Sequence, residues 1–426
     1  MFSLADTDSP HTTYQKLNIK DNKKPIGETL HGEDITAAKS GSFDYICENT
    51  EATFPYVALE CCNLRPTQED RIDFRTIHKF GELSAEEQNS ALNTTFEELQ
   101  TLCDKYETVG ACVMANIITS KGIVTANLGD SESFIVGFNG KCPGVFKRLN
   151  SSLDHPNDSK ERQRLKEFHK TKEDEKQWKK FVTRDGKRLR TPIKDASEQI
   201  ISYANDGLAV SGALGDTLYK KVGLRQTPNI NRSEMHDKEI YLVAGCDGLT
   251  EGNEDTRWIG SSITRAKNFE TPLIQMPMAL LKAAKTNRST DNISIIIVKI
   301  NPLENNLSPA DGECFLVIDG HGGKEVADII HQNFMTILQA NVDKQWKLRH
   351  GLTEEQANPM GYEKEMQTEL QKTYPSEEQS LASIYASNNP HTQWTPAKVL
   401  GKQTNILHDC PELSDDTQEN KNSVGI

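Results

Sequence analysis

Short apolar runs alternate with polar segments through the middle of the chain, and most of the runs are bounded by Gly, Asp or Asn. Seven of them have strand character: residues 56–60, 111–118, 122–127, 134–136, 240–244, 293–300 and 314–318. Apolar runs of this length, several of them rich in β-branched residues, predict buried β-strands.

Two other segments have helical periodicity. Apolar residues recur every three or four positions along residues 86–106 and 324–338. Bursts of strands combined with a few long amphipathic helices predict an α+β fold, built as a layered sandwich.

Both ends of the chain are polar. We expect residues 1–40 to form a polar N-terminal extension and residues 351–426 a C-terminal one, with a surface helix over 353–374 and a disordered tail over 414–426. One folded domain would then span residues 41–350, although the length alone allows about three domains.

Composition limits the class of function. The chain has 426 residues, with 49 Lys and Arg against 62 Asp and Glu, and a formal net charge of -13. Such a chain lacks the cationic surplus with which nucleic-acid binders neutralise phosphates. No run approaches the roughly 20 apolar residues of a membrane span, and the N-terminus lacks the order of a secretory signal. We expect a soluble, cytoplasmic or otherwise intracellular protein that binds no nucleic acid and has no membrane span.

Nine cysteines are spread along the chain, and none forms a C-x-x-C pair. An odd number without metal-ligand spacing is typical of a reduced protein with buried thiols. Cys246 and Cys314, which flank the candidate site described next, are expected to be buried strand residues and not nucleophiles.

One segment departs from the acidic average. Residues 160–194 hold 14 Lys and Arg against 6 Asp and Glu, a local net charge of +8. Two interpretations stay open: a solvated helical surface, or a docking surface for a phosphorylated or acidic partner.

Four apolar runs end or begin at an aspartate beside Gly or Asn. These are Asp130, Asp247, Asp291 and Asp319. The end of a strand brings a side chain to the rim of a sheet, and a following glycine lets another group approach closely. A single Asp-Gly is usually only a turn, but clustered carboxylates repel one another unless a cation neutralises them. Four together predict a divalent-metal site, and oxygen ligands favour Mg2+ or Mn2+ over Zn2+.

An arginine precedes a carboxylate pair near another strand. Arg65 stands four residues before Glu69, which is followed by Asp70. The guanidinium fork matches phosphate oxygens in a two-point contact. Alone, the motif would indicate a surface turn with an ordinary salt bridge. Beside the aspartates and His321, it indicates phosphate held against metals.

These blocks together resemble the metal-dependent Ser/Thr protein phosphatases of the type 2C (PPM) family. The resemblance also rests on residues 153–155 with 161–162, on 207–216 and on 289–292, and it spans about residues 55–345. It implies a four-layer α-β-β-α sandwich of two antiparallel sheets flanked by helices, with a two-metal centre at one end. It also implies a flap-like segment over about 155–205, which contains the basic stretch.

The resemblance assigns metal ligands residue by residue. It implies that Asp319 bridges both metals, that Asp247 and Asp291 hold one of them, and that Glu69 with the Gly320 carbonyl holds the other.

Further roles come from the same resemblance. It implies that Arg65 binds the substrate phosphate and that His321 is the general acid. Asp130 matches a weaker third metal site, whose usual partner aspartate is Glu251 here. The arginine usual in the Ser-Arg-Ala-Leu-Gly-Asp block is Gly212, which removes a local ion pair but no metal ligand.

The order of the blocks departs from the family pattern. In the family, the Asp-Gly-His-Gly-Gly strand and its helix soon follow the Arg…Glu-Asp strand, whereas here residues 314–340 come last. We expect them to be transposed to the C-terminal side of the core, which makes the fold sequence-permuted. The 13 residues of 301–313 can span about 43 Å, enough to return the strand to its sheet.

The resemblance implies hydrolysis of phosphoserine or phosphothreonine, and the residue types predict that metal-activated water carries it out. Two cations lower the pKa of a bridging water, the hydroxide attacks phosphorus in line, and a histidine protonates the leaving oxygen. We expect a phosphorylated protein substrate and a monomer. Two alternatives stay open: a pseudophosphatase that keeps the fold as a binding module, and a hydrolase of a small phosphorylated metabolite. A separate hypothesis, export as a bacterial effector, is not demanded by the composition.

Overall fold

The computed structural model describes residues 11–18, 25–42, 44–139, 142–150, 153–170, 177–194, 197–204, 207–234, 239–253, 255–301 and 307–353. They belong to one compact unit, Met1–Pro359, whereas a second unit, Met360–Ile426, lies outside the described residues. The helix expected over 353–374, apart from its first residue, and the tail expected over 414–426 lie outside them as well.

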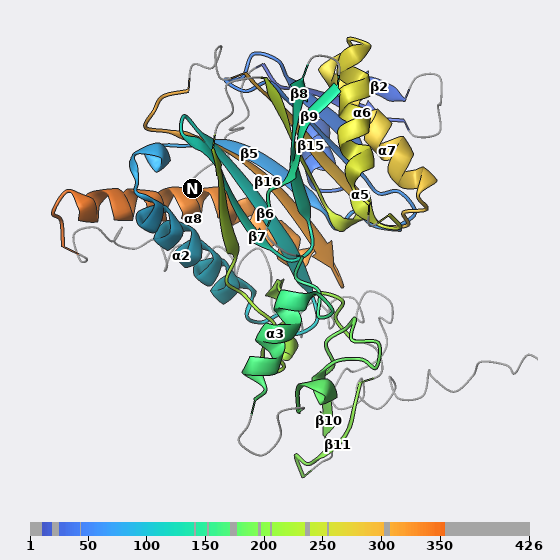
Figure 1. Ribbon diagram of the computed structural model, residues 1–426, viewed down its shortest axis with the longest axis vertical. Helices are drawn as coiled ribbons and strands as arrows, with labels where there is room; N and C mark the ends of the chain where they lie inside the picture. The colour runs from blue at the N-terminus through green and yellow to red at the C-terminus, as the bar shows by residue number, and fades with distance from the viewer. Residues whose placement is uncertain are drawn as a thin grey trace, which may run out of the picture. The chain divides into compact units, whose positions relative to one another are not determined.

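Two antiparallel β-sheets form the centre of the described unit (Figure 1). The larger sheet has the spatial order β2 (Ile26–Thr29), β1 (Thr13–Leu17), β3 (Tyr45–Asn49), β4 (Tyr56–Cys61), β15 (Ile293–Ile300), β14 (Ile240–Gly245), β8 (Glu132–Asn139) and β9 (Cys142–Arg148). The smaller sheet has the order β13 (Asn229–Glu234), β7 (Gly122–Leu128), β6 (Gly110–Thr119), β16 (Gly312–His321) and β5 (Arg71–Ile77), and β12 (Leu214–Gly215) pairs with β6. A separate hairpin joins β10 (Pro192–Lys194) and β11 (Ile200–Tyr203).

The two sheets pack face to face through a shared hydrophobic core. Leu242 and Ile296 of the larger sheet lie in one buried cluster with Met114 and Phe315 of the smaller sheet. The ring of Tyr56 meets the ring of Phe315 edge to face, with centroids 5.5 Å apart. Every residue of β6 is buried, because the strand is covered on both faces. This two-sided burial explains its continuous apolar sequence.

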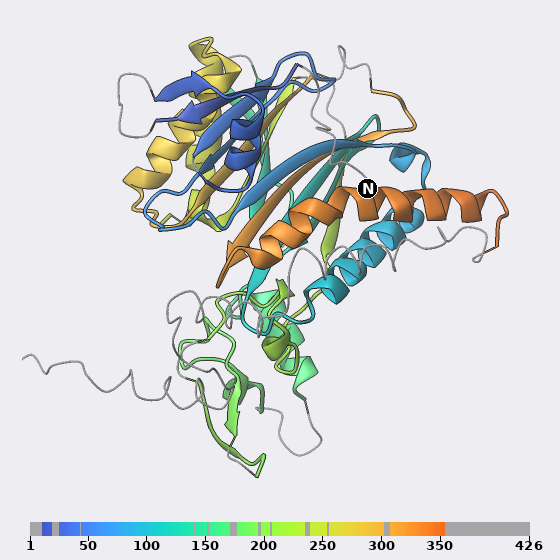
Figure 2. The same cartoon turned by 180° about the vertical axis from the view of Figure 1, so that it is seen from behind.

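Helices cover the outer face of each sheet. On the larger sheet, α6 (Arg257–Asn268) and α7 (Met276–Thr286) share a buried cluster with the strands. On the smaller sheet, α2 (Ala85–Cys103) and α8 (Glu325–Arg349) pack together (Figure 2), and the rings of Phe96 and Phe334 meet edge to face. The predicted four-layer α-β-β-α sandwich is confirmed.

The remaining helices are short. They are α1 (Glu33–Lys39), α3 (Ser159–Phe168), α4 (Thr217–Lys220) and α5 (Asp247–Thr250), with 3-10 turns at Phe80–Glu82, Gln177–Phe181 and Leu273–Gln275. The two long helices start differently: α2 opens on a capping box, in which Ser84 and Glu87 satisfy each other's backbone N–H groups, whereas α8 has no side-chain cap.

Each of the seven predicted strands lies within an observed strand, and both predicted helices are present as α2 and α8. Helix α8 continues to Arg349, well beyond the predicted end. The sequence did not predict β1 and β2, which fall in the range expected to be a polar extension and instead lengthen the larger sheet. Tyr14 and Leu17 of β1 are buried, but the polar residues between them hide the pattern.

Strand β16 occupies the middle of the smaller sheet although it comes last in the sequence. It pairs with β5 on one side and β6 on the other. In this register Ile318 lies opposite Arg71, and Asp319 lies opposite Cys112. The C-terminal end of β16 therefore reaches the same rim of the sheet as the start of β5.

A fully buried arginine joins the start of β5 to α8. Arg71 begins β5, and its guanidinium donates to Asp328 of α8 and to the carbonyls of Gln68 and Ser40. These bonds join β5, α8 and the loop before β5. A buried guanidinium without its carboxylate would be an uncompensated charge.

We predict that Asp328→Ala lowers the free energy of unfolding by about 3 kcal/mol, because it removes the carboxylate that is hydrogen-bonded to the buried Arg71 guanidinium. Urea denaturation measures the change. The control is Asp343→Ala on the same helix, which pairs with Lys79 where both side chains are more than a third exposed; it should cost less than about 1 kcal/mol. Equal losses for the two variants would contradict the role given to Arg71.

Candidate metal centre

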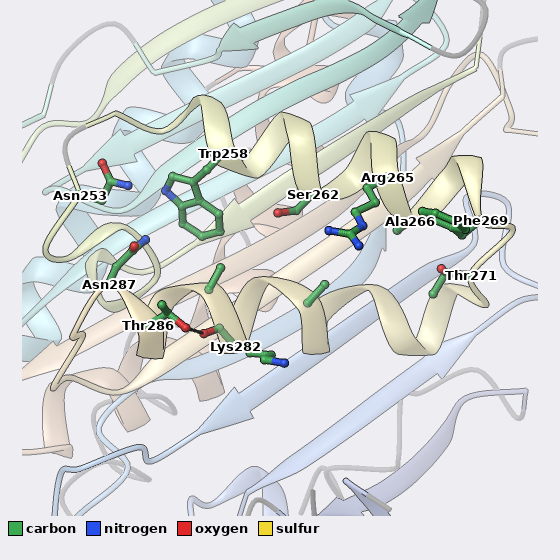
Figure 3. A pocket seen from close by; sticks show the side chains of 12 residues that line it. Asn253, Trp258, Ser262, Arg265, Ala266, Phe269, Thr271, Lys282, Thr286 and Asn287 are labelled. Carbon is green, nitrogen blue, oxygen red and sulfur yellow. Dashed lines mark hydrogen bonds between the residues drawn. The ribbon is translucent and has the colours of Figure 1, made fainter. Parts of the chain in front are cut away.

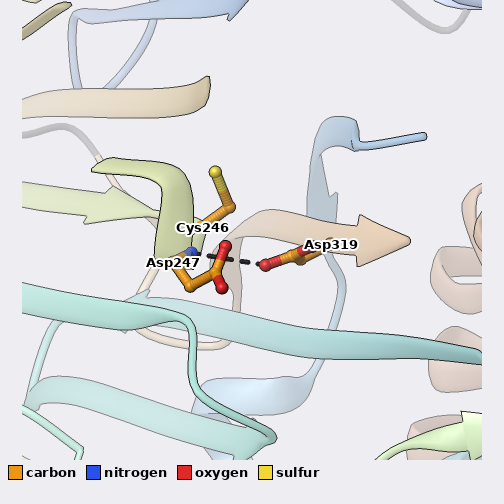
Figure 4. A group of neighbouring side chains, drawn as sticks. All are labelled: Cys246, Asp247 and Asp319. Carbon is orange, nitrogen blue, oxygen red and sulfur yellow. Dashed lines mark hydrogen bonds between the residues drawn. The ribbon is translucent and has the colours of Figure 1, made fainter. Parts of the chain in front are cut away.

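Two aspartates from opposite sheets meet at one end of the sandwich. Asp319 lies near the end of β16, and Asp247 opens α5 after β14. The Asp247 backbone N–H donates to Asp319 Oδ2 at 3.3 Å (Figure 4). With Cys246 they form the one group of three or more candidate ligands, among the described residues, whose ligand atoms all lie within 4.8 Å of one another. The structure thus brings together two of the predicted metal ligands.

Burial and neighbouring carboxylates make this cluster electrostatically unfavourable. Burial raises the pKa of Asp319 well above its ordinary value, and the charges of Asp247, Asp70, Asp130 and Asp291 raise it further. Burial likewise raises the pKa of Asp247, with added repulsion from Asp130, Asp291 and Asp70. The predicted carboxylates therefore lie within electrostatic reach of one another, as a cation site requires.

Asp70 is an acidic neighbour for which no separate role was predicted. It is buried, accepts a hydrogen bond from Ser294 Oγ at 2.9 Å, and precedes Arg71. Burial raises the pKa of Asp70 to about 7, although its bonds to Ser294 and Cys246 oppose the change. The sequence indicated a possible site role for Asp70 only through its position directly after Glu69.

The thiol of Cys246 belongs to the strand framework. Its Sγ donates to the Asn292 carbonyl at 3.3 Å and accepts from the Ser294 N–H at 3.1 Å. Burial raises the pKa of the thiol well above its ordinary value. A neutral thiol is a poor nucleophile and a poor metal ligand. Cys246 and Cys314 are both buried, as predicted.

Arg65 and Glu69 lie on the loop between β4 and β5. The Arg65 guanidinium donates to Asp291 Oδ2, and its side chain is about half exposed. Glu69 Oε1 accepts from Thr67 Oγ1 at 3.3 Å. Asp291 thus links the predicted phosphate-binding arginine to the acidic cluster.

Asn292 fixes the shape of this loop. Its Nδ2 donates to the carbonyls of Cys62 and Thr67, both at 3.0 Å, and its Oδ1 accepts from the Glu69 N–H at 3.0 Å. A single buried amide therefore holds the loop against the residue that follows Asp291. Asn292 belongs to the sequence motif of residues 289–292, but no role was predicted for it.

Gly320 lies directly against Glu69. A Cβ at this position would come within 2.5 Å of the Glu69 carbonyl oxygen and 3.2 Å of Ala327 Cβ. No other residue fits without moving the backbone, which accounts for the glycine after Asp319.

His321 pairs with an aspartate that the sequence did not single out. Its Nε2 lies 2.5 Å from Asp216 Oδ2. Burial lowers the pKa of His321, but the bond to Asp216 outweighs it and the pKa is raised above its ordinary value. Asp216 has a φ of 46°, and its Oδ1 is buried without a partner among the described residues. A residue held in a strained backbone conformation to meet a histidine indicates a positioning role.

Asp130 and Glu251 have different surroundings. Asp130 accepts from Cys112 Sγ at 3.2 Å and lies 3.7 Å from His155 Nε2. Glu251 instead accepts from the backbone N–H groups of Thr290 at 2.7 Å and Asp291 at 3.3 Å. Its carboxylate braces the turn that carries Asp291.

Gly212 lies beside an ion pair that another arginine forms. Arg225 bonds to the buried Asp154, whose Oδ2 accepts from the Gly129 N–H at 2.8 Å. A Cβ on Gly212 would lie 2.4 Å from Asp154 Oδ2, so the space is already filled. Gly212 itself contributes no charge, and Arg225, 13 residues further along the chain, supplies the partner of Asp154 here.

Several cations of the basic segment have structural partners. Arg164 bonds to Glu161 and to the carbonyls of Ser211 and Gly223. Arg190 bonds to the carbonyls of Ala204 and Tyr203. These contacts stabilise α3 and the hairpin, so only part of the positive charge is available to a partner.

The fold and the cluster define the class of protein: an α-β-β-α sandwich with a buried acidic centre at one end. The sequence model named Protein phosphatase 2C matches residues 60–272, half of the 426 residues. The chain belongs to the Protein phosphatase 2C family.

Curated relatives have the same family name. Probable protein phosphatase 2C 8 of Arabidopsis thaliana is 31% identical over 91 residues, which cover 21% of this chain and 26% of the relative. Probable protein phosphatase 2C 55 of Oryza sativa subsp. japonica is 26% identical over 224 residues, which cover 50% of this chain and 48% of the relative. The matches thus span half or less of these relatives' lengths.

Solved structures of phosphatases are similar at low identity. A phosphatase from a pathogenic strain of Toxoplasma gondii is 14% identical with a TM-score of 0.42, over 58% of this chain and 93% of that one. The catalytic domain of the phosphatase PstP, in complex with 2 manganese ions, is 12% identical with a TM-score of 0.33, over 57% of this chain and 97% of that one.

We predict that Asn292→Ala lowers the free energy of unfolding by about 2 kcal/mol, because it leaves three backbone groups of this partly buried loop without their hydrogen-bond partner. Hydrogen exchange should show faster exchange at the Glu69 amide. The control is Asn333→Ala, which loses one bond within its own helix. Unchanged protection at Glu69 in Asn292→Ala would contradict the proposed bracing.

Proposed function

We propose that the chain is a metal-dependent protein phosphatase that hydrolyses phosphoserine and phosphothreonine. The observation that supports this most is the meeting of Asp247 and Asp319 beside the Arg65–Asp291 pair. These residues come from four separate segments and offer acidic oxygens together with a guanidinium. Family membership supports the same function, although the curated relatives are matched over only part of their length.

The donor set fits divalent cations. The carboxylates of Asp247 and Asp319 lie in a largely buried cluster, and their repulsion is relieved when a cation binds. Asp319, Asp247 and Asp291 would hold one ion, and Asp319, Glu69 and the Gly320 carbonyl would hold a second. Oxygen ligands favour Mg2+ or Mn2+. When bound, such ions lower the pKa of a water and neutralise charge on phosphoryl oxygens.

We assign no third cation to Asp130 and Glu251. The Glu251 carboxylate already accepts two backbone hydrogen bonds at the Asp291 turn. Its proposed role is to orient Asp291.

The remaining residues orient the substrate and move a proton. The Arg65 guanidinium is half exposed and can bind two phosphate oxygens. His321 would protonate the leaving Ser or Thr oxygen, which is strongly basic. Asp216 would hold the imidazole in place and favour its protonated form.

We predict turnover of an aryl phosphate and of a phosphothreonine peptide with Mn2+, and none with a chelator. Asp319→Asn should lower kcat by about a thousandfold, because it removes a ligand shared by both ions. Asp343→Asn, a carboxylate on the outer helix, is the control and should leave kcat unchanged.

The alternatives give different outcomes in the same assay. Phosphopeptide binding without turnover under any metal would indicate a pseudophosphatase. Turnover of small phosphorylated metabolites, without turnover of the peptide, would indicate a metabolite hydrolase. Full activity in Asp319→Asn would exclude the proposed centre.

The roles of His321 and Asp216 predict a dependence on the leaving group. His321→Ala and Asp216→Asn should lower kcat on the phosphothreonine peptide by about a hundredfold. An aryl phosphate with an acidic phenol needs no proton, so its turnover should fall much less. Equal losses on both substrates, measured with Mn2+ saturating, would count against proton transfer from His321.

We also propose that β16 and α8 form a transposed unit. The start of β16 lies beside the end of β5, because Gly312 pairs with Ile77 and the Lys79 N–H donates to Asp311 at 3.0 Å. The end of α8 lies beside the start of α2, where Arg349 bonds to the Glu82 carbonyl. Residues 312–350 thus begin and end next to the connection between β5 and α2.

This proximity predicts that the segment can be moved back. A chain in which residues 312–350 follow His78 through short Gly/Ser linkers should fold with a melting temperature within about 10 °C of the original. The control moves the same segment into the exposed turn at Gly186. Loss of folding in the first chain, by circular dichroism, would contradict the proposed transposition.

A further inference from the structure

A groove runs between α6 and α7, on the outside of the larger sheet (Figure 3). It has a volume of about 780 Å3 and is open to solvent. Its lining comes from three places: the α6 face, the α7 face, and the segments that flank the two helices, which contribute Asn253, Thr271 and Asn287. None of these residues belongs to the acidic centre.

Two helix faces form the walls. Trp258, Ser262 and Arg265 recur along α6 at the spacing of a single face, and Phe269, the C-cap of the helix, continues that face. Small side chains line the space between the helices: Ala266 of α6, with Ala279 and Ala283 of α7. Alanines on facing helices leave room for another element to lie close to the backbone.

The groove is cationic in a chain whose formal net charge is -13. Arg265 and Lys282 line it, and none of the described residues that line it is acidic. Figure 3 shows the Arg265 side chain directed into the space between the helices, and the Lys282 side chain lying along α7. Within the part of the chain that the structure describes, neither has a carboxylate partner. Arg265 lies only over the Phe269 ring, 5.8 Å from its centroid.

The two aromatic residues of the groove also lack some contacts. The Phe269 side chain is 74% exposed. The Trp258 Nε1–H is buried without an acceptor among the described residues. An exposed aromatic ring, a donor without a described acceptor and two cations without a described carboxylate partner are features that an occupant with apolar and acidic groups would satisfy.

We propose that this groove docks an acidic amphipathic helix of a partner protein. Trp258 and Phe269 are 11 positions apart along α6, which corresponds to about 16 Å or three helical turns. That length suits a helix lying along the groove better than a compact molecule. Its apolar side chains pack on the alanines and Phe269, and its carboxylates reach Arg265 and Lys282.

The groove can be tested independently of phosphatase activity. The probe is a fluorescein-labelled helical peptide of about four turns, with leucines on one face and glutamates on the flanks. A matched peptide has lysines in place of the glutamates. Fluorescence anisotropy with the full chain should show binding of the acidic peptide only.

Two kinds of variant test the location. Reversing the groove charges with Arg265→Glu and Lys282→Glu should weaken binding at least about tenfold. Ala279→Leu should weaken it by filling the groove without a change of charge. The control pair, Lys344→Glu and Lys347→Glu on α8, changes the net charge equally and should bind as the unmodified chain does. Circular dichroism verifies that each variant is folded.

Three results would overturn the proposal: no binding of the acidic peptide, equal binding by the charge-reversed chain, or binding of both peptides alike. A small anionic dye, anilinonaphthalene sulfonate, that binds the groove where the peptide does not would assign it to a small amphiphile instead. Aryl phosphate turnover of the charge-reversed chain should stay within about twofold of the original. Peptide binding remains measurable even in a chain without turnover.

Discussion

The acidic end of the sandwich depends on holding like charges close together. Two unit charges about 4 Å apart repel by about 4 kcal/mol at an effective dielectric constant of 20. The whole stability of a domain is only about 5–15 kcal/mol. Burial and mutual repulsion raise the pKa values of Asp70, Asp247 and Asp319. The cluster therefore needs protons or cations, and its oxygen donors suit divalent ions.

The surrounding framework keeps these carboxylates in place. Asn292 holds the loop of Arg65 and Glu69 with three hydrogen bonds, and Arg71 ties that loop to α8. Strand β16 delivers Asp319 from the middle of the smaller sheet. Its position depends on strand register and not on sequence order, so a late segment can complete a centre begun by an early one.

The sequence predicted what depends on local pattern. Strands such as β6 and β15 are continuous apolar runs, and Asp247 and Asp319 stand at strand ends, so both were visible. The roles of Asp216, Asn292 and Arg225 were not predictable from the sequence, because each depends on a partner that is distant along the chain. The partners are 105, 223 and 71 residues away, respectively. Five of the six residues of β13 are polar, and the strand lies at the edge of its sheet, so its sequence shows no apolar face. The groove of α6 and α7 arises only when two helices pack.

The central claim is that Asp247 and Asp319 come together in order to hold divalent cations. Crystals grown with Mn2+ and measured at the manganese absorption edge test it most directly. The account predicts anomalous peaks beside Asp319, within coordination distance of Asp247 on one side and of Glu69 or the Gly320 carbonyl on the other. A manganese-saturated crystal with no anomalous peak at Asp319 would contradict it.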